Sequence, residues 1–267
     1  MRNLIKALTA KQSYKTPQAY ISEQHGLRHL HLGSNAIQSS MRLSDPFDLV
    51  LAYSRCMFSF LLFEAAPPFI LHIGLGGGSI AKFAYQHLPT TRQIIIELSP
   101  QIIDIAHSQF YVPDDKQRLR IIQAEGQDYL KSLKEAMPIV LLDAFGPEGI
   151  VGSLATTSFF RLCHTRLNEQ GILISNLWRS DRAFPSIVNR LSQVFNRQVL
   201  CLPAIPRGNV IAIAFKHWQP LSWETLQHRA QQLEQRIPLE FTSFITNLKN
   251  TPQQTIEDSN GLISFSR

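Results

Sequence analysis

The sequence of 267 residues predicts an α/β fold whose mostly parallel sheet is closed by an antiparallel hairpin. Two observations predict this fold. From Phe69 onward, short β-rich runs alternate with segments long enough for crossover helices, which is typical of a parallel sheet. The last two β-runs, residues 198–202 and 209–215, are joined by only residues 203–208, which is too short for a helical crossover. These two runs must therefore pair antiparallel.

The individual elements follow in order along the chain. Five strands are predicted at residues 69–73, 93–97, 119–123, 139–143 and 171–176, before the final hairpin. Helices are predicted at residues 79–87, 100–110, 126–135, 156–167 and 183–195. A Rossmann-like sheet with a closing antiparallel hairpin is the arrangement of S-adenosylmethionine-dependent methyltransferases and their relatives. Nicotinamide-binding Rossmann domains usually lack that hairpin.

Smaller regions flank this sheet on both sides. Alternating polar and apolar residues at 19–32 and 36–43 predict a β-hairpin, followed by a buried helix at 47–63. After the sheet, helices are predicted at 222–235, with Ser222 as N-cap, and at 239–248. We therefore expect an N-terminal β-hairpin region with its linking helix at 1–65, a Rossmann-like nucleoside-binding domain at 66–218 and a C-terminal helical extension at 219–267.

Composition narrows the possible partners and the compartment. The net charge of +6 comes from scattered Lys and Arg residues without an aromatic-plus-basic cluster, so no nucleic-acid partner is expected. The longest apolar stretch, residues 56–66, is too short for a membrane span, and residues 1–10 have no signal-peptide core. Three cysteines, at 56, 163 and 201, lie in apolar stretches and predict free thiols in a cytoplasmic protein. The histidines lack metal-ligand spacing, and we expect no metal.

A glycine loop follows the first parallel strand. Gly74, Gly76, Gly77 and Gly78 precede Ser79, where the next helix begins. Such glycines let the backbone turn sharply and approach a ligand, toward which the helix points free N–H groups. A tight turn needed only for packing would also use glycine, but the position between strand and helix favours a cofactor-binding loop.

Two acidic residues end the next two strands. Glu97 lies about twenty residues beyond the loop, where a carboxylate accepts hydrogen bonds from a ribose diol. Glu125 and Gly126 follow the third strand, where an acidic residue can accept from an adenine amino group. A solvated carboxylate or helix cap is the alternative for Glu97, and a plain surface loop for Glu125. Because the loop and both acids lie at carboxyl ends of strands, a shared nucleoside site is predicted.

The fourth and fifth strands end in further candidate site residues. Asp143 ends a strongly apolar strand and is a candidate general base or cation partner, with a loop cap as the alternative. Asn176 and Trp178 close the fifth strand and could supply an amide and an aromatic wall to a substrate, although Trp178 is equally compatible with a core position.

These motifs together resemble the spermidine synthase (polyamine aminopropyltransferase) family up to about Lys216. The matching segments are Leu32-Gly-Ser-Asn-Ala-Ile-Gln38-Ser-Ser, Ile73-Gly-Leu-Gly-Gly-Gly78, Ile96-Glu97, Glu125-Gly126, Leu142-Asp143 and Ile205-Pro-Arg-Gly208. The resemblance implies a small β-domain before a Rossmann-like domain, decarboxylated S-adenosylmethionine or S-adenosylmethionine as co-substrate, an amine acceptor and a homodimer. It further implies that Gln38 contacts the nucleoside, Glu97 the ribose and Glu125-Gly126 the adenine, and that Asp143 deprotonates the amine.

The sequence departs from this family mainly on the amine-binding side. Ser79 and Ile80 follow the glycine loop where the family has Asp-Gly, and Asp143-Ala-Phe-Gly146 replaces Asp-Ser-Ser-Asp. The hairpin tip loses the family's tyrosine, and Tyr53 is the best match for its substrate-binding tyrosine before the first strand. Each positive charge of a polyamine needs a carboxylate, so these losses, with Arg55 or Arg207 nearby, should weaken polyamine binding.

The leading hypothesis is aminopropyl transfer from a sulfonium nucleoside to an amine whose identity is open. A methyltransferase that uses S-adenosylmethionine is the first alternative, because the missing loop aspartate leaves room for the methionine carboxylate. A non-catalytic nucleoside-binding protein is the second. A nicotinamide dehydrogenase fits least, given the antiparallel hairpin and Glu125.

Overall fold

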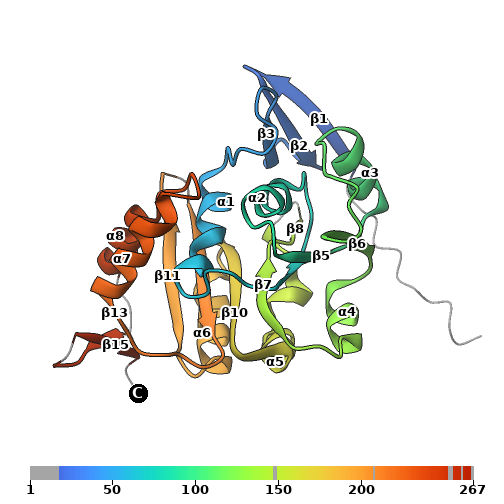
Figure 1. Ribbon diagram of the computed structural model, residues 1–267. Coiled ribbons are helices and arrows are strands. Elements are labelled where there is room, and N and C mark those ends of the chain that lie inside the picture. The colour runs from blue at the N-terminus through green and yellow to red at the C-terminus, as the bar shows by residue number, and fades with distance from the viewer. Residues whose placement is uncertain (1–17, 147–148, 207, 252–254, 260, 266–267) are drawn as a thin grey trace, which may run out of the picture.

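The centre of the molecule is a seven-stranded sheet in the spatial order β11-β12-β10-β7-β4-β5-β6 (Figure 1). The computed structural model of the chain describes residues 18–146, 149–206, 208–251, 255–259 and 261–265. In chain order the sheet strands are β4 (Phe69–Ile73), β5 (Arg92–Glu97), β6 (Leu119–Gln123), β7 (Met137–Leu142), β10 (Leu167–Trp178), β11 (Val199–Ala204) and β12 (Asn209–Phe215). Neighbours from β10 to β6 are parallel, whereas β12 pairs antiparallel with both β10 and β11. The predicted fold class, including its closing hairpin, is confirmed.

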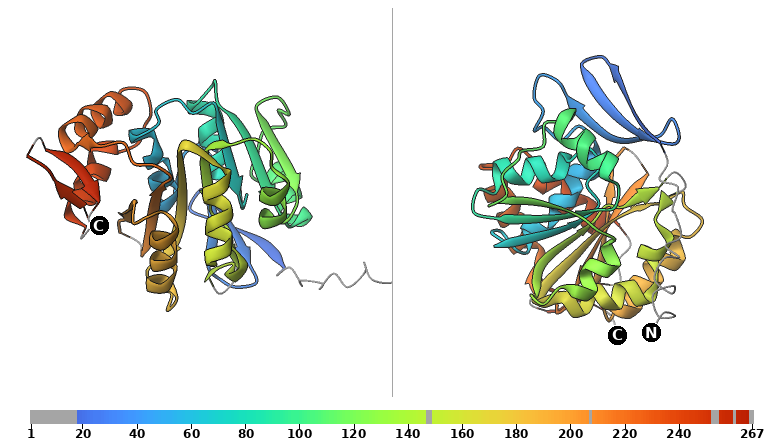
Figure 2. Two further views of the ribbon diagram at one scale, coloured as in Figure 1. Left: turned by 90° about the horizontal axis from the view of Figure 1, so that it is seen from below. Right: turned by 90° about the vertical axis from the view of Figure 1, so that its right-hand side faces the viewer.

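Helices cover both faces of this sheet (Figure 2). The helices of the Rossmann-like part are α2 (Ser79–His87), α3 (Pro100–Ser108), α4 (Gly126–Ser132), α5 (Thr157–Arg166) and α6 (Phe184–Val194), with the short η2 (Gly152–Ala155) before α5. Alternate residues of β4 divide between two hydrophobic clusters: Ile70 packs with α2, and Leu71 packs with α4, α5 and α6. Successive side chains of a strand point to opposite faces, so a sheet covered by helices on both faces needs apolar residues at every position of its strands.

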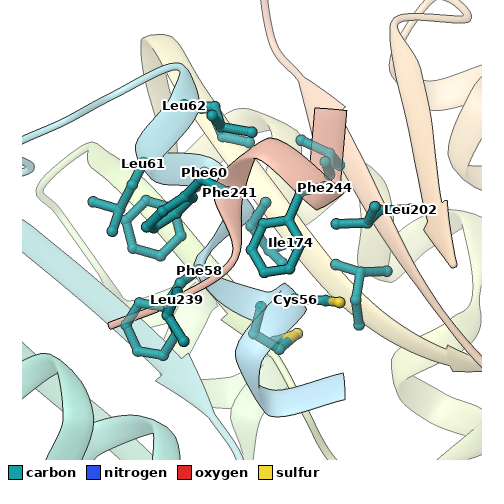
Figure 3. Close-up of a cluster of buried hydrophobic side chains, with 14 of the residues drawn as sticks. Cys56, Phe58, Phe60, Leu61, Leu62, Ile174, Leu202, Leu239, Phe241 and Phe244 are labelled. Atoms are coloured by element: carbon teal, nitrogen blue, oxygen red, sulfur yellow. The ribbon is translucent and has the colours of Figure 1, made fainter. Parts of the chain in front are cut away.

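The face that carries α2 is extended by a buried segment and by the C-terminal helices. α1 (Ala52–Cys56) runs directly into the 3₁₀ helix η1 (Met57–Leu62), all six residues of which are buried. Figure 3 shows this segment between strands β10 and β11 on one side and the α8 region on the other. The predicted helix at 47–63 is therefore wrong in extent, because the helical segment begins only at Ala52 and divides in two.

The C-terminal region contains more than the two predicted helices. α7 (Trp223–Glu234) and α8 (Phe241–Asn250) are present, and the Ser222 hydroxyl caps α7 by accepting from Thr225 N at 3.0 Å. A small sheet in the order β13-β15-β14 accompanies them, formed by β13 (Leu221–Ser222), β14 (Thr255–Glu257) and β15 (Leu262–Phe265). No sequence signal was assigned to these short strands. Among the described residues, no helix combines the length and apolar character that crossing a membrane needs.

The N-terminal region is a three-stranded sheet and not a two-stranded hairpin. β1 (Ala19–Gln24), β2 (Leu27–Leu32) and β3 (Ile37–Arg42) pair antiparallel in that order. His25 and Gly26 both have positive φ, 50° and 74°, and form the tight turn that divides the predicted strand at 19–32. A further two-stranded pair, β8 (Phe145–Gly146) and β9 (Gly149–Ile150), lies beyond β7. Residues 1–10 and Arg207 lie outside the described residues.

Candidate active site

The predicted site residues meet at one edge of the central sheet. Asp143 follows β7, the glycine loop follows β4, Glu97 ends β5 and Glu125 lies just beyond β6. These four strands are consecutive neighbours and run parallel. Their carboxyl ends therefore lie side by side, which is where open α/β sheets bind ligands.

The glycine loop and Asp143 are in direct backbone contact. Gly74 has φ of 100°, and a Cβ atom on it would lie only 2.2 Å from the carbonyl oxygen of Asp143. Asp143 N in turn donates to Ile73 O at 3.0 Å. Glycine at position 74 is thus required for the close approach that places the loop beside Asp143.

Strand β3 covers the remainder of the glycine loop. Ser39 Oγ accepts from Gly77 N at 2.8 Å, and the Ser79 hydroxyl donates to Ser40 O at 3.4 Å. A Cβ atom on Gly76 would lie 2.7 Å from Ser39 Oγ. The other glycines of the loop are equally confined: a Cβ atom on Gly77 would meet Phe110, and one on Gly78 would meet Val112. The N-terminal sheet is therefore part of the site.

Glu97 holds the loop through its carboxylate. Its Oε2 accepts from Leu75 N at 3.0 Å, and its Oε1 accepts from Ser99 N at 2.8 Å. Burial raises the pKa of Glu97, while the backbone N–H bonds oppose this increase. The backbone N–H groups of Leu98 and Gly76 also act on this carboxylate, so Glu97 is held by the loop and by its own strand end. Contact of Glu97 with a ribose stays a prediction.

Glu125 caps the helix that follows it. Its Oε2 accepts from Asp128 N at 2.8 Å, at the first turn of α4. Gly126 is buried, and a Cβ atom there would lie 2.7 Å from Ile73 Cγ2, so this position needs a residue without a side chain. The pair has a clear structural role, and contact of Glu125 with adenine stays a prediction.

Asp143 is a partly buried carboxylate in a chain of amides. Asn176 Nδ2 donates to Asp143 Oδ1 at 2.9 Å, and Asn209 Nδ2 donates to Asn176 Oδ1 at 2.9 Å. Burial raises the pKa of Asp143 to about 6, against the opposing effect of hydrogen bonds from Asn176 and Tyr53. Such a pKa suits a general base near neutral pH. Asn209 did not emerge from the sequence, because only the register of β10 and β12 brings it to Asn176.

Tyr53 approaches Asp143 from helix α1. Its hydroxyl lies 3.3 Å from Gln38 O and can donate its proton to this carbonyl. The same hydroxyl can instead donate to the carboxylate of Asp143. Burial and the neighbouring Asp143 raise the pKa of Tyr53 well above its usual value, so its hydroxyl stays protonated. The side-chain Nε2 of Gln38 is buried without a hydrogen-bond partner among the described residues. A free, buried donor at this position is compatible with a ligand that supplies an acceptor.

An aromatic pair stands next to the amide chain. The rings of Trp178 and Phe145 stack with centroids 5.1 Å apart and planes inclined by 24°. Trp178 was expected as a substrate wall or as core, and its partner Phe145 was not anticipated. Phe145 lies two residues after Asp143, so the stacked pair is close to the candidate base.

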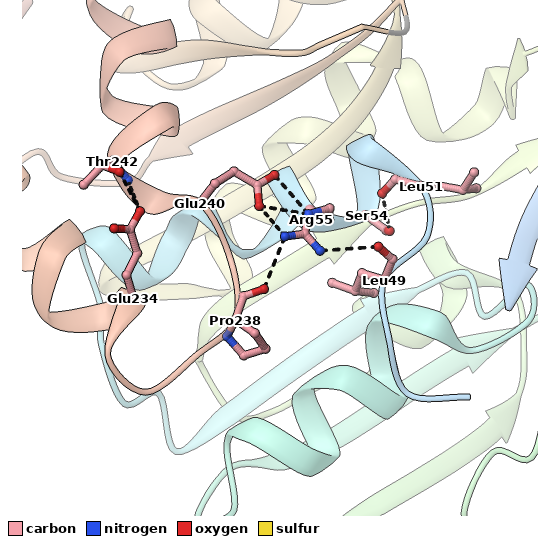
Figure 4. A network of polar contacts seen from close by, with 8 residues as sticks. All are labelled: Leu49, Leu51, Ser54, Arg55, Glu234, Pro238, Glu240 and Thr242. Carbon is pink, nitrogen blue, oxygen red and sulfur yellow. Dashed lines mark hydrogen bonds and ion pairs between the residues drawn. The ribbon is translucent and has the colours of Figure 1, made fainter. Parts of the chain in front are cut away.

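Arg55 does not face the amine side of the site, contrary to the expectation from sequence. Its Nε lies 3.0 and 2.9 Å from the two carboxylate oxygens of Glu240, and its Nη2 donates to Glu240 and to Pro238 O (Figure 4). The side chain ties α1 to the segment before α8. Within the described residues, no group of three or more His, Cys, Asp or Glu side chains is arranged to hold a metal ion.

Comparison with known proteins identifies the family. The model of the spermine/spermidine synthase domain matches residues 51–222. A polyamine aminopropyltransferase from Chromobacterium violaceum is 43% identical over 240 residues, which cover 90% of this chain and 92% of the relative. Among solved structures, a spermidine synthase in complex with the transition-state analogue AdoDATO has a TM-score of 0.67 at 18% identity and covers 87% of this chain and 85% of its own. Human methyltransferase-like protein 13 in complex with SAH has a TM-score of 0.60 at 24% identity, over 70% of this chain and 89% of its own. The chain therefore belongs to the spermine/spermidine synthase family of transferases.

Proposed function

We propose that this protein transfers an aminopropyl group from decarboxylated S-adenosylmethionine to a primary amine, with Asp143 as the general base. The environment of Asp143 is the main support for this proposal. Its carboxylate is partly buried, has a pKa of about 6 and lies against the glycine loop. The similarity to curated polyamine aminopropyltransferases over 90% of the chain supports the same reaction class.

The residues around the loop fit an adenine nucleoside. Glu97 places a partly buried carboxylate at the glycine loop, and Gln38 has a buried donor without a partner among the described residues. Positive φ at Gly74 and Gly76 brings the loop backbone within reach of a ligand. We assign Gln38, Glu97 and Glu125-Gly126 to nucleoside binding on this basis and on the family resemblance.

The raised pKa of Asp143 assists removal of a proton from the attacking amine. An alkylammonium with a pKa near 10 loses its proton more readily to a carboxylate of pKa about 6 than to one of 3.8. The difference of about two units corresponds to about 3 kcal/mol less unfavourable transfer. The hydrogen bond from Asn176 favours the charged carboxylate and so opposes the effect of burial on the pKa of Asp143.

The reaction balances without any further reactant. The amine nitrogen forms a bond to the aminopropyl carbon attached to the sulfonium, and the carbon–sulfur bond breaks. Its electron pair remains on sulfur, which becomes a neutral thioether, while Asp143 takes the proton from the amine. Placement of the two substrates side by side supplies much of the rate.

The acceptor side is less acidic than the family pattern and more aromatic. Phe145 and Trp178 offer a stacked apolar surface near Asp143. We propose that the methylene chain of the acceptor packs on this pair, while Tyr53 and Asn176 line the reacting end.

Calorimetric titration with decarboxylated S-adenosylmethionine and, separately, with S-adenosylmethionine tests this function. Preference for the decarboxylated compound, followed by turnover with putrescine or longer amines that is lost in Asp143→Asn, is the expected result. Binding of neither compound contradicts the proposal.

A methyltransferase is the second candidate, favoured by the fold similarity to methyltransferase-like protein 13. Preference for intact S-adenosylmethionine, with methyl transfer in place of aminopropyl transfer, is the outcome that would select it.

A further inference from the structure

A fully buried lysine lies on the helix that follows the glycine loop. Lys82 is in the first turn of α2, where its backbone N–H donates to Gly78 O at 2.9 Å. Its exposed fraction is 0%, and no other Lys, Arg, Asp or Glu in the described ranges is buried. The N-terminal sheet and β5 contact α2 from two sides (Figure 1), so the charge of Lys82 is enclosed within the protein.

The ammonium of Lys82 reaches two segments that are distant in the sequence. Its Nζ donates to Phe110 O at 2.7 Å, just after α3, and lies 3.1 Å from Met41 Sδ on β3. It also lies 5.8 Å from the ring centre of Phe47. Lys82 has no ion pair with any described residue, and Asp45 attracts it only over a longer distance.

A buried ammonium without a paired carboxylate is unfavourable for the fold. Burial lowers the pKa of Lys82 to about 8, so the group is still mostly protonated at pH 7 and keeps its N–H donors. An apolar side chain of similar length would avoid the desolvation of this charge. The hydrogen bond to Phe110 O therefore indicates a role for Lys82 beyond filling space.

Both segments that Lys82 contacts also pack against the glycine loop. A Cβ atom on Gly77 would lie 2.8 Å from Cδ1 of Phe110, so this ring fits closely against the loop backbone. On β3, Ser39 lies two residues before Met41, and its Oγ accepts from Gly77 N at 2.8 Å. Gly77 is thus enclosed between two segments that contact the same ammonium.

A second cation holds the segment after α3. Arg28 on β2 donates to Gln109 O, and its guanidinium lies 5.7 Å from the ring centre of Tyr111. Arg28 also pairs with Glu23, and its side chain is 15% exposed. The N-terminal sheet therefore fixes this segment through Arg28, while Lys82 fixes it from α2.

We propose that Lys82 is a positioning residue for the sulfonium nucleoside, because its ammonium fixes β3 and the Phe110 segment against the glycine loop. The inference rests on the proposed aminopropyl transfer and deepens it by naming a residue outside the ligand site on which donor affinity depends. Lys82 acts through the loop and touches neither substrate. Asp143 and the stacked aromatic pair are not among its contacts, so its loss should weaken donor binding and spare acceptor recognition.

Calorimetric titration and steady-state kinetics of Lys82→Met in the full-length chain test this role. Methionine keeps most of the apolar stem and removes the charge and the N–H donors. The Kd for decarboxylated S-adenosylmethionine should rise about tenfold, the effect of losing one hydrogen bond from a charged group. The KM for putrescine at saturating donor should stay nearly unchanged. Lys82→Gln keeps a shorter, neutral donor and should give a smaller rise in the donor Kd.

Lys216→Met is the matched control. Lys216 is also a mostly buried lysine, 15% exposed, and its Nζ donates to a backbone carbonyl, Leu167 O, at 2.8 Å. Leu167 pairs with Met137 at the start of β10 and β7, so this lysine lies at the opposite edge of the sheet from the site. Lys216→Met should leave the donor Kd unchanged, whereas Arg28→Met should raise it by a smaller factor than Lys82→Met.

The outcomes separate this inference from the proposed function. Unchanged donor Kd in folded Lys82→Met, or in Lys82→Gln if the first variant does not fold, would overturn the inference and leave the proposed function standing. An equal rise of the donor Kd in Lys216→Met, or an equal rise of the KM for putrescine, would also overturn it, because the effect would then be a general loss of structure. Failure of the unaltered protein to bind either nucleoside would overturn the proposed function and this inference with it.

Discussion

The hydrogen bond from Asn176 should set the pH at which Asp143 becomes active. Asn176 Nδ2 donates to Asp143 Oδ1 at 2.9 Å and so favours the charged carboxylate. Asn176→Leu removes this donor in a side chain of similar size. The pKa of Asp143, about 6 in the unaltered protein, should therefore rise.

The magnitude follows from the strength of a hydrogen bond to a charged group. Such a bond contributes about 1.5–3 kcal/mol, and one pKa unit corresponds to about 1.4 kcal/mol. Tyr53 remains as a second donor and offsets part of the loss. We expect an increase of about one unit in Asn176→Leu, and a smaller one in Asn209→Ala, which only loosens the orientation of Asn176.

The assay is the pH dependence of kcat/KM, which reports ionisation of the free enzyme. Its acidic limb should have a midpoint near pH 6 in the unaltered protein and near pH 7 in Asn176→Leu. Ser175→Ala is the control, because this neighbouring serine is buried, its hydroxyl has no partner among the described residues, and alternation along β10 points it to the other face. An acidic limb that stays in place in a folded Asn176→Leu protein would refute the assignment of Asp143 as the base.

Three further changes probe the framework of the site. Gly74→Ala places a Cβ atom against Asp143 O, so we expect kcat to fall at least about tenfold in steady-state assays, with a loss of about 1–3 kcal/mol in the free energy of unfolding; unchanged kcat would show that the loop and the base are not coupled. Phe58→Ala leaves a cavity under α1, and urea denaturation should show a loss of about 3–5 kcal/mol; a loss below 1 kcal/mol would contradict the packing in Figure 3. Arg55→Met should destabilise by about 1–2 kcal/mol and more than Glu240→Gln, because Arg55 also donates to backbone carbonyls whereas the half-exposed Glu240 contributes a partly screened ion pair; equal effects in urea titrations would contradict this division.

The sequence predicted the parts of the site that depend on strand ends. Asp143 and Glu97 each end an apolar run, and the length of the runs alone places them at one edge of a parallel sheet. The closing hairpin was equally predictable, because a linker of six residues leaves no other pairing. The turn at His25 and Gly26 was missed because His-Gly is not a usual hairpin signal, although both residues adopt positive φ.

The residues that sequence reasoning missed depend on contacts between strands. Asn209 and Asn176 are 33 residues apart, and they meet because Asn209 lies opposite Trp178 in the β10–β12 register, diagonal to Asn176. This contact could not be assigned without the pairing of β12 with β10.

Alternation along the strands explains why these polar residues converge on one face of the sheet. His72 lies opposite Leu141 in the β4–β7 register, and Leu141 lies two residues before Asp143, so all three side chains point to the face that carries α2. The residues between them, such as Leu142, pack on the opposite face with α4, α5 and α6. That opposite face stays apolar to the end of the strand, whereas the α2 face changes from apolar to polar within its last residues. A buried polar group is retained there only if a partner compensates its desolvation, so a polar ligand is expected at this end of the α2 face, where Asp143 lies.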